Sequence, residues 1–244
     1  MRLDSCFPRE LEEAKKNRTP VVMAGGTVEY HAAHCGYGCD TLIVEGLLTE
    51  LAKRRDLIIA PSISYTPASW AVGGDTTGTV HVDERVFEEY CYHIFSSMLS
   101  AGLRNIYVVI QHQFEGGTFM PMTLSFKKAG KRATMRYLEK TLGQGWWGSE
   151  SYADYYENLG GEDDPFSWIK VIPAMSPRAQ KATGDDHAGK YETSLLMALY
   201  PEAVHLERLG EKKHWFTKNA VEASPELGRK MMEVSLEDLD QAIR

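Results

Sequence analysis

Acidic and histidine side chains gather in a polar segment that follows an apolar run near the start of the chain. Glu29 and His31 are two positions apart, so in extended backbone both side chains point to the same side. Asp40 follows at the start of a helical pattern, where aspartate is also a common helix cap. Because all three follow one strand, we expect Asp40 to serve as a carboxylate that can bridge metal ions.

A second candidate ligand follows another apolar run. His112 comes directly after the sequence IYVVI and would emerge at the carboxyl end of a strand. A lone histidine there is commonly a hydrogen-bonded structural residue, but parallel strands deliver their carboxyl ends to one edge of a sheet. We therefore expect His112 to join the first cluster. Glu115 is a spare carboxylate whose direction the sequence leaves open.

A third group of titratable residues opens a helical pattern in the second half of the chain. Glu192 shares a helix face with Leu195, Leu196 and Leu199, so its carboxylate should point inward. A buried carboxylate needs a cation, a metal ion or strong donors, although a negative charge also suits the start of a helix. His187 precedes this helix and could move protons near neutral pH.

The four cysteines are too few and too scattered for a disulfide framework. Cys35 and Cys39 lie beside His31 and His34, which raises the question of a zinc site with thiolate ligands. No second pair of thiols follows, so the spacing is poor for such a site. We expect both to be small packed side chains.

Alternating strand and helix patterns must position these residues. Short apolar runs predict strands at 20–24, at 57–60 before Pro61, at 106–110 and at 168–172. Apolar residues at helical spacing predict helices at 40–55, 83–103, 124–142, 189–200 and 224–243. This alternation predicts an α/β fold with a mostly parallel sheet and helices on both faces.

The stretch 118–167 interrupts the alternation and is predicted to be an insertion or lid within a single domain spanning 1–244. Its aromatic residues include Trp146 and Trp147, with glycines between them. Such a segment suits a mobile cover over a pocket, where Trp146 and Trp147 would bind substrate. A contact with an adjacent subunit and ordinary surface packing are the alternatives.

Charge and composition exclude several classes of partner. Lys and Arg total 27 against 34 Asp and Glu, for a formal charge of −7, the wrong sign for nucleic acid or anionic membranes. No window approaches the roughly 20 apolar residues of a membrane span. The first residues carry no apolar targeting segment, so we expect a cytoplasmic protein whose partner is a small molecule.

Taken together, these motifs resemble the creatininase (creatinine amidohydrolase) family from about 20 to 201. The resemblance implies a three-layer α/β/α sandwich, a centre of one or two metal ions, and a homo-oligomer, usually a hexamer. It implies that Glu29, His31, Asp40 and His112 are metal ligands, with Asp40 as the bridge. Glu192 matches an acid near the metals, either a ligand or a base, and His187 a proton shuttle.

Several positions depart from the usual family pattern. Tyr30 stands in the first motif, and Gln111 and Gln113 flank His112. Where creatininase has a further metal-binding Glu, this chain has Phe114, so the fifth ligand must come from Glu192, Glu115 or water. The amides of Gln111 and Gln113 suit hydroxyl groups, which favours a polyhydroxylated substrate over creatinine.

The sequence thus leaves three functions open. The first is a hydrolase that uses Zn, Mn or Fe to activate water against the carbonyl of a small, cyclic, polar amide. The second is a C–C hydrolase that opens a cyclic polyol diketone, since some relatives resembling creatininase hydrolyse 3-dehydro-scyllo-inosose in inositol catabolism. The third is a catalytically silent metal-binding assembly protein.

Overall fold

A four-stranded parallel sheet forms the centre of the molecule. The computed structural model describes residues 1–112, 120–157, 159–161 and 164–244. The strands run in the order β2-β1-β3-β4, and each neighbouring pair is parallel. Their bounds are β1 Val21–Gly25, β2 Ile58–Ile63, β3 Ile106–Ile110 and β4 Ile169–Pro173.

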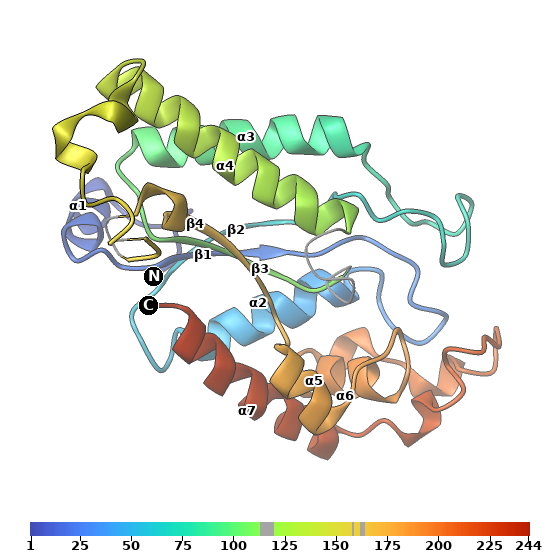
Figure 1. The fold of residues 1–244 in the computed structure, drawn as a ribbon. Coiled ribbons are helices and arrows are strands. Elements are labelled where there is room, and N and C mark those ends of the chain that lie inside the picture. The colour runs from blue at the N-terminus through green and yellow to red at the C-terminus, as the bar shows by residue number, and fades with distance from the viewer. Residues whose placement is uncertain (113–119, 158, 162–163) are drawn as a thin grey trace.

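Helices cover both faces of this sheet (Figure 1). One face carries α3 (Glu84–Ser100) and α4 (Pro121–Leu142). The other carries α2 (Cys39–Leu51), α5 (Pro177–Thr183), α6 (Lys190–Leu199) and α7 (Pro225–Ala242). The predicted three-layer α/β/α fold is therefore confirmed. No helix in the described ranges is long and apolar enough to cross a membrane.

Alternate side chains of the central strands pack into two separate cores. In β1, Val22 and Ala24 pack on the side of α2 and α7, whereas Val21 and Met23 pack on the side of α3 and α4. Side chains of a strand alternate between the two faces of a sheet. Both sets must be apolar when helices cover both faces, which explains the continuous apolar runs in the sequence.

The predicted elements are present with shifted ends, and two helices were missed. Strand β2 continues through Pro61 instead of stopping before it. A proline is tolerated there because β2 is an edge strand, where the missing N–H breaks no ladder bond. The missed helices, α1 (Pro8–Lys16) and α5, each have proline at their start and are too short to display a clear apolar period. Single 3₁₀ turns connect the remaining elements at Trp146–Gly148, Glu150–Tyr152, Pro165–Ser167, Pro201–Ala203, Leu206–Arg208 and Ala220–Glu222.

The end of β1 lies close against the start of α2. A Cβ atom on Gly26 would lie 2.4 Å from the backbone nitrogen of Thr41, so only glycine fits this position without displacing backbone. This approach brings the segment after β1 over the first turn of α2, which carries Asp40. The carboxyl end of the sheet is therefore where the polar residues of the first motif meet.

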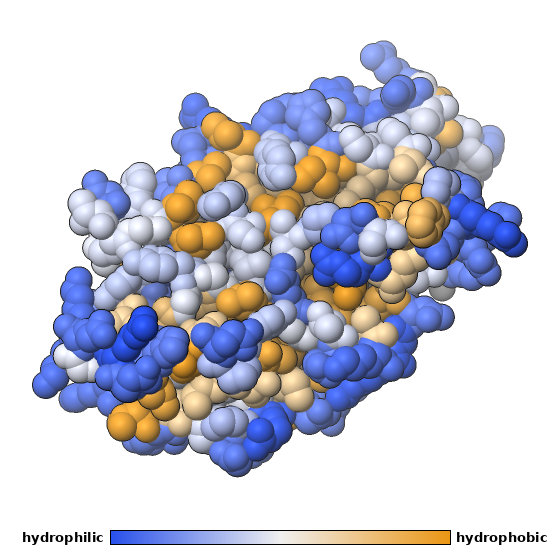
Figure 2. Space-filling model, turned by 180° about the vertical axis from the view of Figure 1, so that it is seen from behind, coloured by the Kyte–Doolittle hydropathy of each residue, from blue (hydrophilic) through white to orange (hydrophobic). Residues whose placement is uncertain are grey.

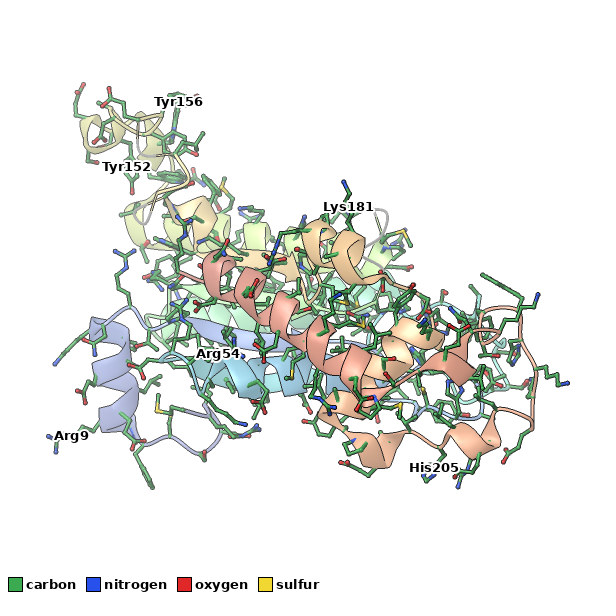
Figure 3. All side chains as sticks on the ribbon, turned by 90° about the horizontal axis from the view of Figure 1, so that it is seen from below. Arg9, Arg54, Tyr152, Tyr156, Lys181 and His205 are labelled. Atoms are coloured by element: carbon green, nitrogen blue, oxygen red, sulfur yellow. The ribbon has the colours of Figure 1, made fainter. Side chains whose placement is uncertain are left out.

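The aromatic segment lies at the opposite end of the molecule. Helix α4 starts near the carboxyl ends of the strands and runs back along the sheet (Figure 1); its 22 residues span about 33 Å. Tyr152 and Tyr156 project beyond the far end, well away from His205 (Figure 3). Within one chain, α4 thus carries the described aromatic residues away from the carboxyl ends of the strands.

Candidate metal centre

Five buried ligand-type side chains converge at the carboxyl end of the sheet. Glu29 and His31 come from the loop after β1, Asp40 from α2, His112 from the end of β3, and Glu192 from the first turn of α6. Exposure is at most 4% for all of these except His112, whose side chain is 10% exposed. The structure therefore brings together the residues that the sequence predicted as metal ligands.

Asp40 lies between two histidines. Its Oδ1 is 3.6 Å from Nε2 of His31, and its Oδ2 is 3.6 Å from Nδ1 of His112. Glu29 lies beside His112, with Oε2 3.2 Å from Nδ1, and Glu192 lies beside His31, with Oε2 3.4 Å from Nε2. One carboxylate oxygen of Asp40 thus lies beside His31 and the other beside His112. A ligand that bridges two ions requires this arrangement.

Several of the converging atoms lack a hydrogen-bond partner of good geometry. Within the part of the chain that the structure describes, these include Oε2 of Glu29, Nε2 of His31 and Oδ2 of Asp40. Buried polar atoms are nearly always satisfied, and an unsatisfied one costs free energy. Mixed imidazole and carboxylate ligands suit divalent transition metals. The residues therefore fit a metal centre. Among the described residues, three overlapping groups could hold ions: Glu29, Asp40 and His112; Glu29, His31 and His187; and His31, Cys39 and Glu192.

The backbone fixes the ring orientation of His31. Its Nδ1 lies 3.0 Å from the carbonyl oxygen of Glu29, and only a protonated Nδ1 can donate to a carbonyl. In the neutral ring the lone pair then resides on Nε2, which faces Asp40 and Glu192. Metal-binding histidines are commonly oriented by such a bond on the other ring nitrogen.

Glu192 is held by a donor on each of its oxygens. The backbone N–H of Ala188 donates to Oε2 at 2.7 Å, and Nε2 of Gln111 donates to Oε1 at 3.3 Å. Ala188 has a φ of 48°, a left-handed conformation that costs free energy in a residue other than glycine. The strained turn aims the Ala188 N–H at Glu192, so the inward direction predicted for this carboxylate is confirmed.

Asp186 supports Glu192 and was missed by the sequence reasoning. Its Oδ1 accepts a hydrogen bond from the Glu192 N–H at 3.0 Å, and its Oδ2 accepts one from the Tyr191 N–H at 3.2 Å. Asn219 accepts the N–H of Lys190 at 3.2 Å. These bonds satisfy orphan amides of the first turn of α6. The signal available was an aspartate a few residues before a helical pattern, but Asp186 lies three residues before the N-cap, Gly189.

The backbone turns at His112, which has a φ of 78°. Adjacent residues would alternate in an extended segment, but this turn lets His112 and Gln111 line the same small cavity. The cavity also touches Asp40, His187 and Glu192, and it is largely polar. The other polar side chains around it are Gln180, Asp185 and Asp186. Gln113 and Glu115 lie outside the described residues.

Burial and mutual charge shift the pKa values of the cluster. Burial opposes the charged form of His31, but Glu192 and Asp40 outweigh it and raise the pKa of His31 well above its usual value. Glu29 and Asp40 likewise outweigh burial at His112 and raise its pKa. Burial favours a neutral Asp40, yet the charge of His31 lowers its pKa. Burial raises the pKa of Glu192 to about 8.

His187 lies at the mouth of the cluster with its side chain 29% exposed. Its ring is 4.4 Å from that of His31, and its Nδ1 is 4.0 Å from Oε2 of Glu29. Nε2 lies 3.3 Å from the carbonyl oxygen of Tyr30, so a proton on Nε2 can be donated there. Burial and the charge of His31 lower the pKa of His187, so its neutral form predominates near pH 7.

The structure does not bring Trp146 and Trp147 to the metal cluster. They line a separate hollow with Met135, Tyr155 and Phe166. Edge-to-face contacts join Trp146 to Tyr152 and Trp147 to Tyr155. Within one chain, these residues therefore pack with one another and do not line the cavity of His112.

Comparison with known proteins supports a relationship to creatininases. A family model described as "Creatininase: Creatinine amidohydrolase" matches residues 6–243. The creatinine amidohydrolase of Pseudomonas putida is 23% identical over 189 residues, which cover 75% of this chain and 65% of that relative. The match thus spans slightly less than two thirds of the relative's length.

Solved structures share the same fold. A creatininase described as a Mn form has a TM-score of 0.74 at 19% identity, with 100% of this chain and 97% of that chain covered. A putative creatinine amidohydrolase from Bacteroides fragilis NCTC 9343 has a TM-score of 0.65 at 18% identity, covering 100% of this chain and 94% of that chain. These likenesses establish a common fold.

Proposed function

Since this chain belongs to the creatininase family, we propose that it is a metal-dependent amidohydrolase. The reaction is hydrolysis of a C–N bond next to a carbonyl group in a small, polar, cyclic substrate. The observation that carries this proposal is the position of Asp40, with one carboxylate oxygen at His31 and the other at His112. A catalytically silent assembly protein has no need of the retained inward carboxylate of Glu192.

A divalent ion held by these residues would lower the pKa of a bound water towards neutrality and polarise the substrate carbonyl. One set of metal ligands would be Glu29, Asp40 and His112. The other would be His31, Asp40 and Glu192. With its proton on Nε2, directed at the carbonyl of Tyr30, His187 would present an unprotonated Nδ1 to Glu29 and would be placed to accept a proton from the attacking water. The same imidazole then returns that proton to the leaving nitrogen, as a general acid.

The lining of the cavity supports a substrate rich in hydrogen-bonding groups. Gln111 and Gln180 offer amides, and Asp185 and Asp186 add carboxylates, beside the metal cluster. Such donors and acceptors match hydroxyl groups better than the mostly unsubstituted ring of creatinine. This polar lining also favours the second candidate, a C–C hydrolase that opens a cyclic polyol diketone such as 3-dehydro-scyllo-inosose. The amidohydrolase remains first because the family model carries that description.

We further propose zinc, manganese or iron as the resident ion and a homo-oligomer as the working form. Among the similar structures, one is described as a Mn creatininase and another as a Zn–Zn type. Apolar side chains gather in groups among hydrophilic ones on the rear face (Figure 2). The exposed residues Tyr65, Val86 and Tyr90 line one hollow beside the edge strand β2, a feature that subunit contacts can cover.

A substrate panel tests the proposal. The metal-loaded protein and a chelated sample are assayed side by side with cyclic amides, formamides, creatinine and a 3-dehydro-inosose. Metal-dependent cleavage of an amide supports the first candidate, and metal-dependent ring opening of the inosose supports the second. Rapid turnover of creatinine with no action on the polyol would contradict the preference for a hydroxyl-rich substrate, and no metal-dependent turnover of any compound would contradict the hydrolase.

A further inference from the structure

We propose that Cys39 is a thiolate ligand of the ion that His31 and Glu192 hold. This inference rests on the proposed metal centre and assigns a ligand beyond it. A ligand nitrogen of His31, the sulfur of Cys39 and a carboxylate oxygen of Glu192 all lie within 4.8 Å of one another. All three side chains are buried. The sequence led us to expect only a packed cysteine here, because the motif contains no second pair of thiols.

One ion can reach all three atoms. Zinc binds sulfur at about 2.3 Å and imidazole nitrogen at about 2.0–2.1 Å, so it can join two such atoms up to about 4.4 Å apart. The His31, Cys39 and Glu192 atoms all lie within 4.8 Å of one another, so no pair exceeds this reach by more than a few tenths of an ångström. Small side-chain rotations on ion binding close that difference. Asp40 Oδ1, 3.6 Å from Nε2 of His31, completes a set of four.

Cys39 lies at a helix start, which can stabilise a thiolate once an ion is bound. It is the first residue of α2, a helix of 13 residues, and precedes Asp40 directly. The positive end of a helix favours an anion. Without a cation, burial, the neighbouring Cys35 thiol and the carboxylates of Glu192 and Asp40 raise the pKa of the Cys39 thiol, so binding of the ion must release the thiol proton to solvent. Nε2 of His31 has no hydrogen-bond partner among the described residues, which gives independent evidence of an ion at this position.

Cys35 provides an internal comparison. Its sulfur lies 3.6 Å from Oγ1 of Thr193, and Thr193 also contacts Nε2 of His34 at 3.0 Å. None of the candidate metal-binding groups in the described residues includes Cys35. The Cys35 thiol lies beside that of Cys39, so exchange of Cys35 tests whether this neighbouring sulfur, and not Cys39, binds the ion.

A sulfur ligand makes the two metal positions favour different ions. Thiolate favours zinc and cadmium, whereas carboxylate and water suit manganese. The position with His31, Asp40, Glu192 and Cys39 has four protein ligands, as closed zinc sites do. The position with Glu29, Asp40 and His112 has three, which leaves room for water and substrate. Exchange of Cys39 for serine should therefore shift the first position from zinc towards manganese.

Cadmium titration of the metal-free, reduced protein tests the proposal directly. Thiolate bound to cadmium gives an ultraviolet charge-transfer band, and bound cadmium is counted in parallel by elemental analysis. Wild type and Cys35→Ser should show the band, and Cys39→Ser should lose it. Cys39→Ser should also bind zinc about ten- to a hundredfold more weakly, the size of effect typical of a lost supporting group at a metal site. A protein in which Cys6, Cys35 and Cys91 are all serine should keep the band.

The outcomes separate this inference from the proposed centre. Cadmium that binds wild type in an Asp40-dependent manner without the band would overturn the thiolate ligand and leave the centre intact. A full band in folded Cys39→Ser would also overturn it. Wild type that binds no cadmium would contradict both proposals. Because the decisive spectrum comes from wild type, the test holds even if Cys39→Ser fails to fold.

Discussion

Nε2 of His31 lies 3.4 Å from Oε2 of Glu192, and both side chains are buried. The two residues come from distant parts of the chain, the loop after β1 and the first turn of α6. The backbone fixes each one: His31 donates to the carbonyl of Glu29, and Glu192 accepts from the N–H of Ala188. Such preorganisation places a ligand nitrogen and a carboxylate side by side before any ion binds.

We expect Glu192→Gln to keep the fold but lose most of the turnover. Glutamine preserves the shape of the side chain, and the Gln111 amide can still reach its oxygen, but the negative charge beside His31 disappears. If Glu192 served only as a charge at a helix start, the change would cost about 0.3–1 kcal/mol of stability and no activity. Thermal unfolding and kcat, measured on the same preparation, distinguish these cases. Undiminished turnover would exclude the catalytic role.

Metal affinity should rise with pH across the range near neutrality. A histidine must lose its proton to bind an ion, and neighbouring carboxylates raise the pKa values of His31 and His112 above their usual value in the metal-free protein. Protons therefore compete with the ion at low pH, and the competition ends as pH rises above those pKa values. Calorimetric titrations with zinc in buffers of different ionisation enthalpy measure the protons released. Zero release near pH 7 would show that both histidines are already neutral.

Removal of Asp186 should weaken metal binding through Glu192. Asp186→Ala removes two hydrogen bonds to the first turn of α6 and should cost about 1 kcal/mol, as loss of a helix cap does. Ser224→Ala is the control, since Ser224 caps α7 by accepting from the Leu227 N–H. Both variants should lose similar stability, but only Asp186→Ala should lower metal affinity and turnover. Equal metal affinity in the two variants would show that Asp186 acts only as a helix cap.

The aromatic segment offers a test of subunit contact. Trp147 is 49% exposed and Tyr156 is 72% exposed, and both lie far from the metal cluster of their own chain. If a partner covers them, Trp147→Ala should lower the mass of the oligomer in light scattering. It should also raise the rate of limited proteolysis in this segment, whereas a substrate analogue should not change it. An unchanged mass with unchanged cleavage would indicate ordinary surface packing.

Much of the fold was predictable because local patterns agree with the tertiary structure. The run IYVVI predicted β3 at its observed bounds, since both faces of that strand are buried and every residue must be apolar. The spacing of Leu195, Leu196 and Leu199 gave the inward face of α6, and hence the direction of Glu192. The residues that follow β1 and β3 lie close together as expected, because the carboxyl ends of parallel strands lie at the same edge of the sheet.

Other features depend on backbone conformations and long-range contacts that no local pattern encodes. The positive φ of His112 turned Gln111 into the cavity, although strict alternation would have placed the two on opposite sides. Asp186 acts through amides five and six residues later, beyond the usual cap spacing. The direction of α4 decided that Trp146 lies away from the cluster, and composition alone carries no information about that direction.

Metal content of wild type and of Asp40→Ala is the most direct test of the central claim, that Glu29, His31, Asp40 and His112 hold metal. Both proteins are purified identically, checked for the native fold by circular dichroism, and analysed for zinc, manganese and iron. Because Asp40 touches both histidines, we expect wild type to carry one or two ions per chain and Asp40→Ala to lose most of them. Equal metal content in the two folded proteins would contradict the assignment.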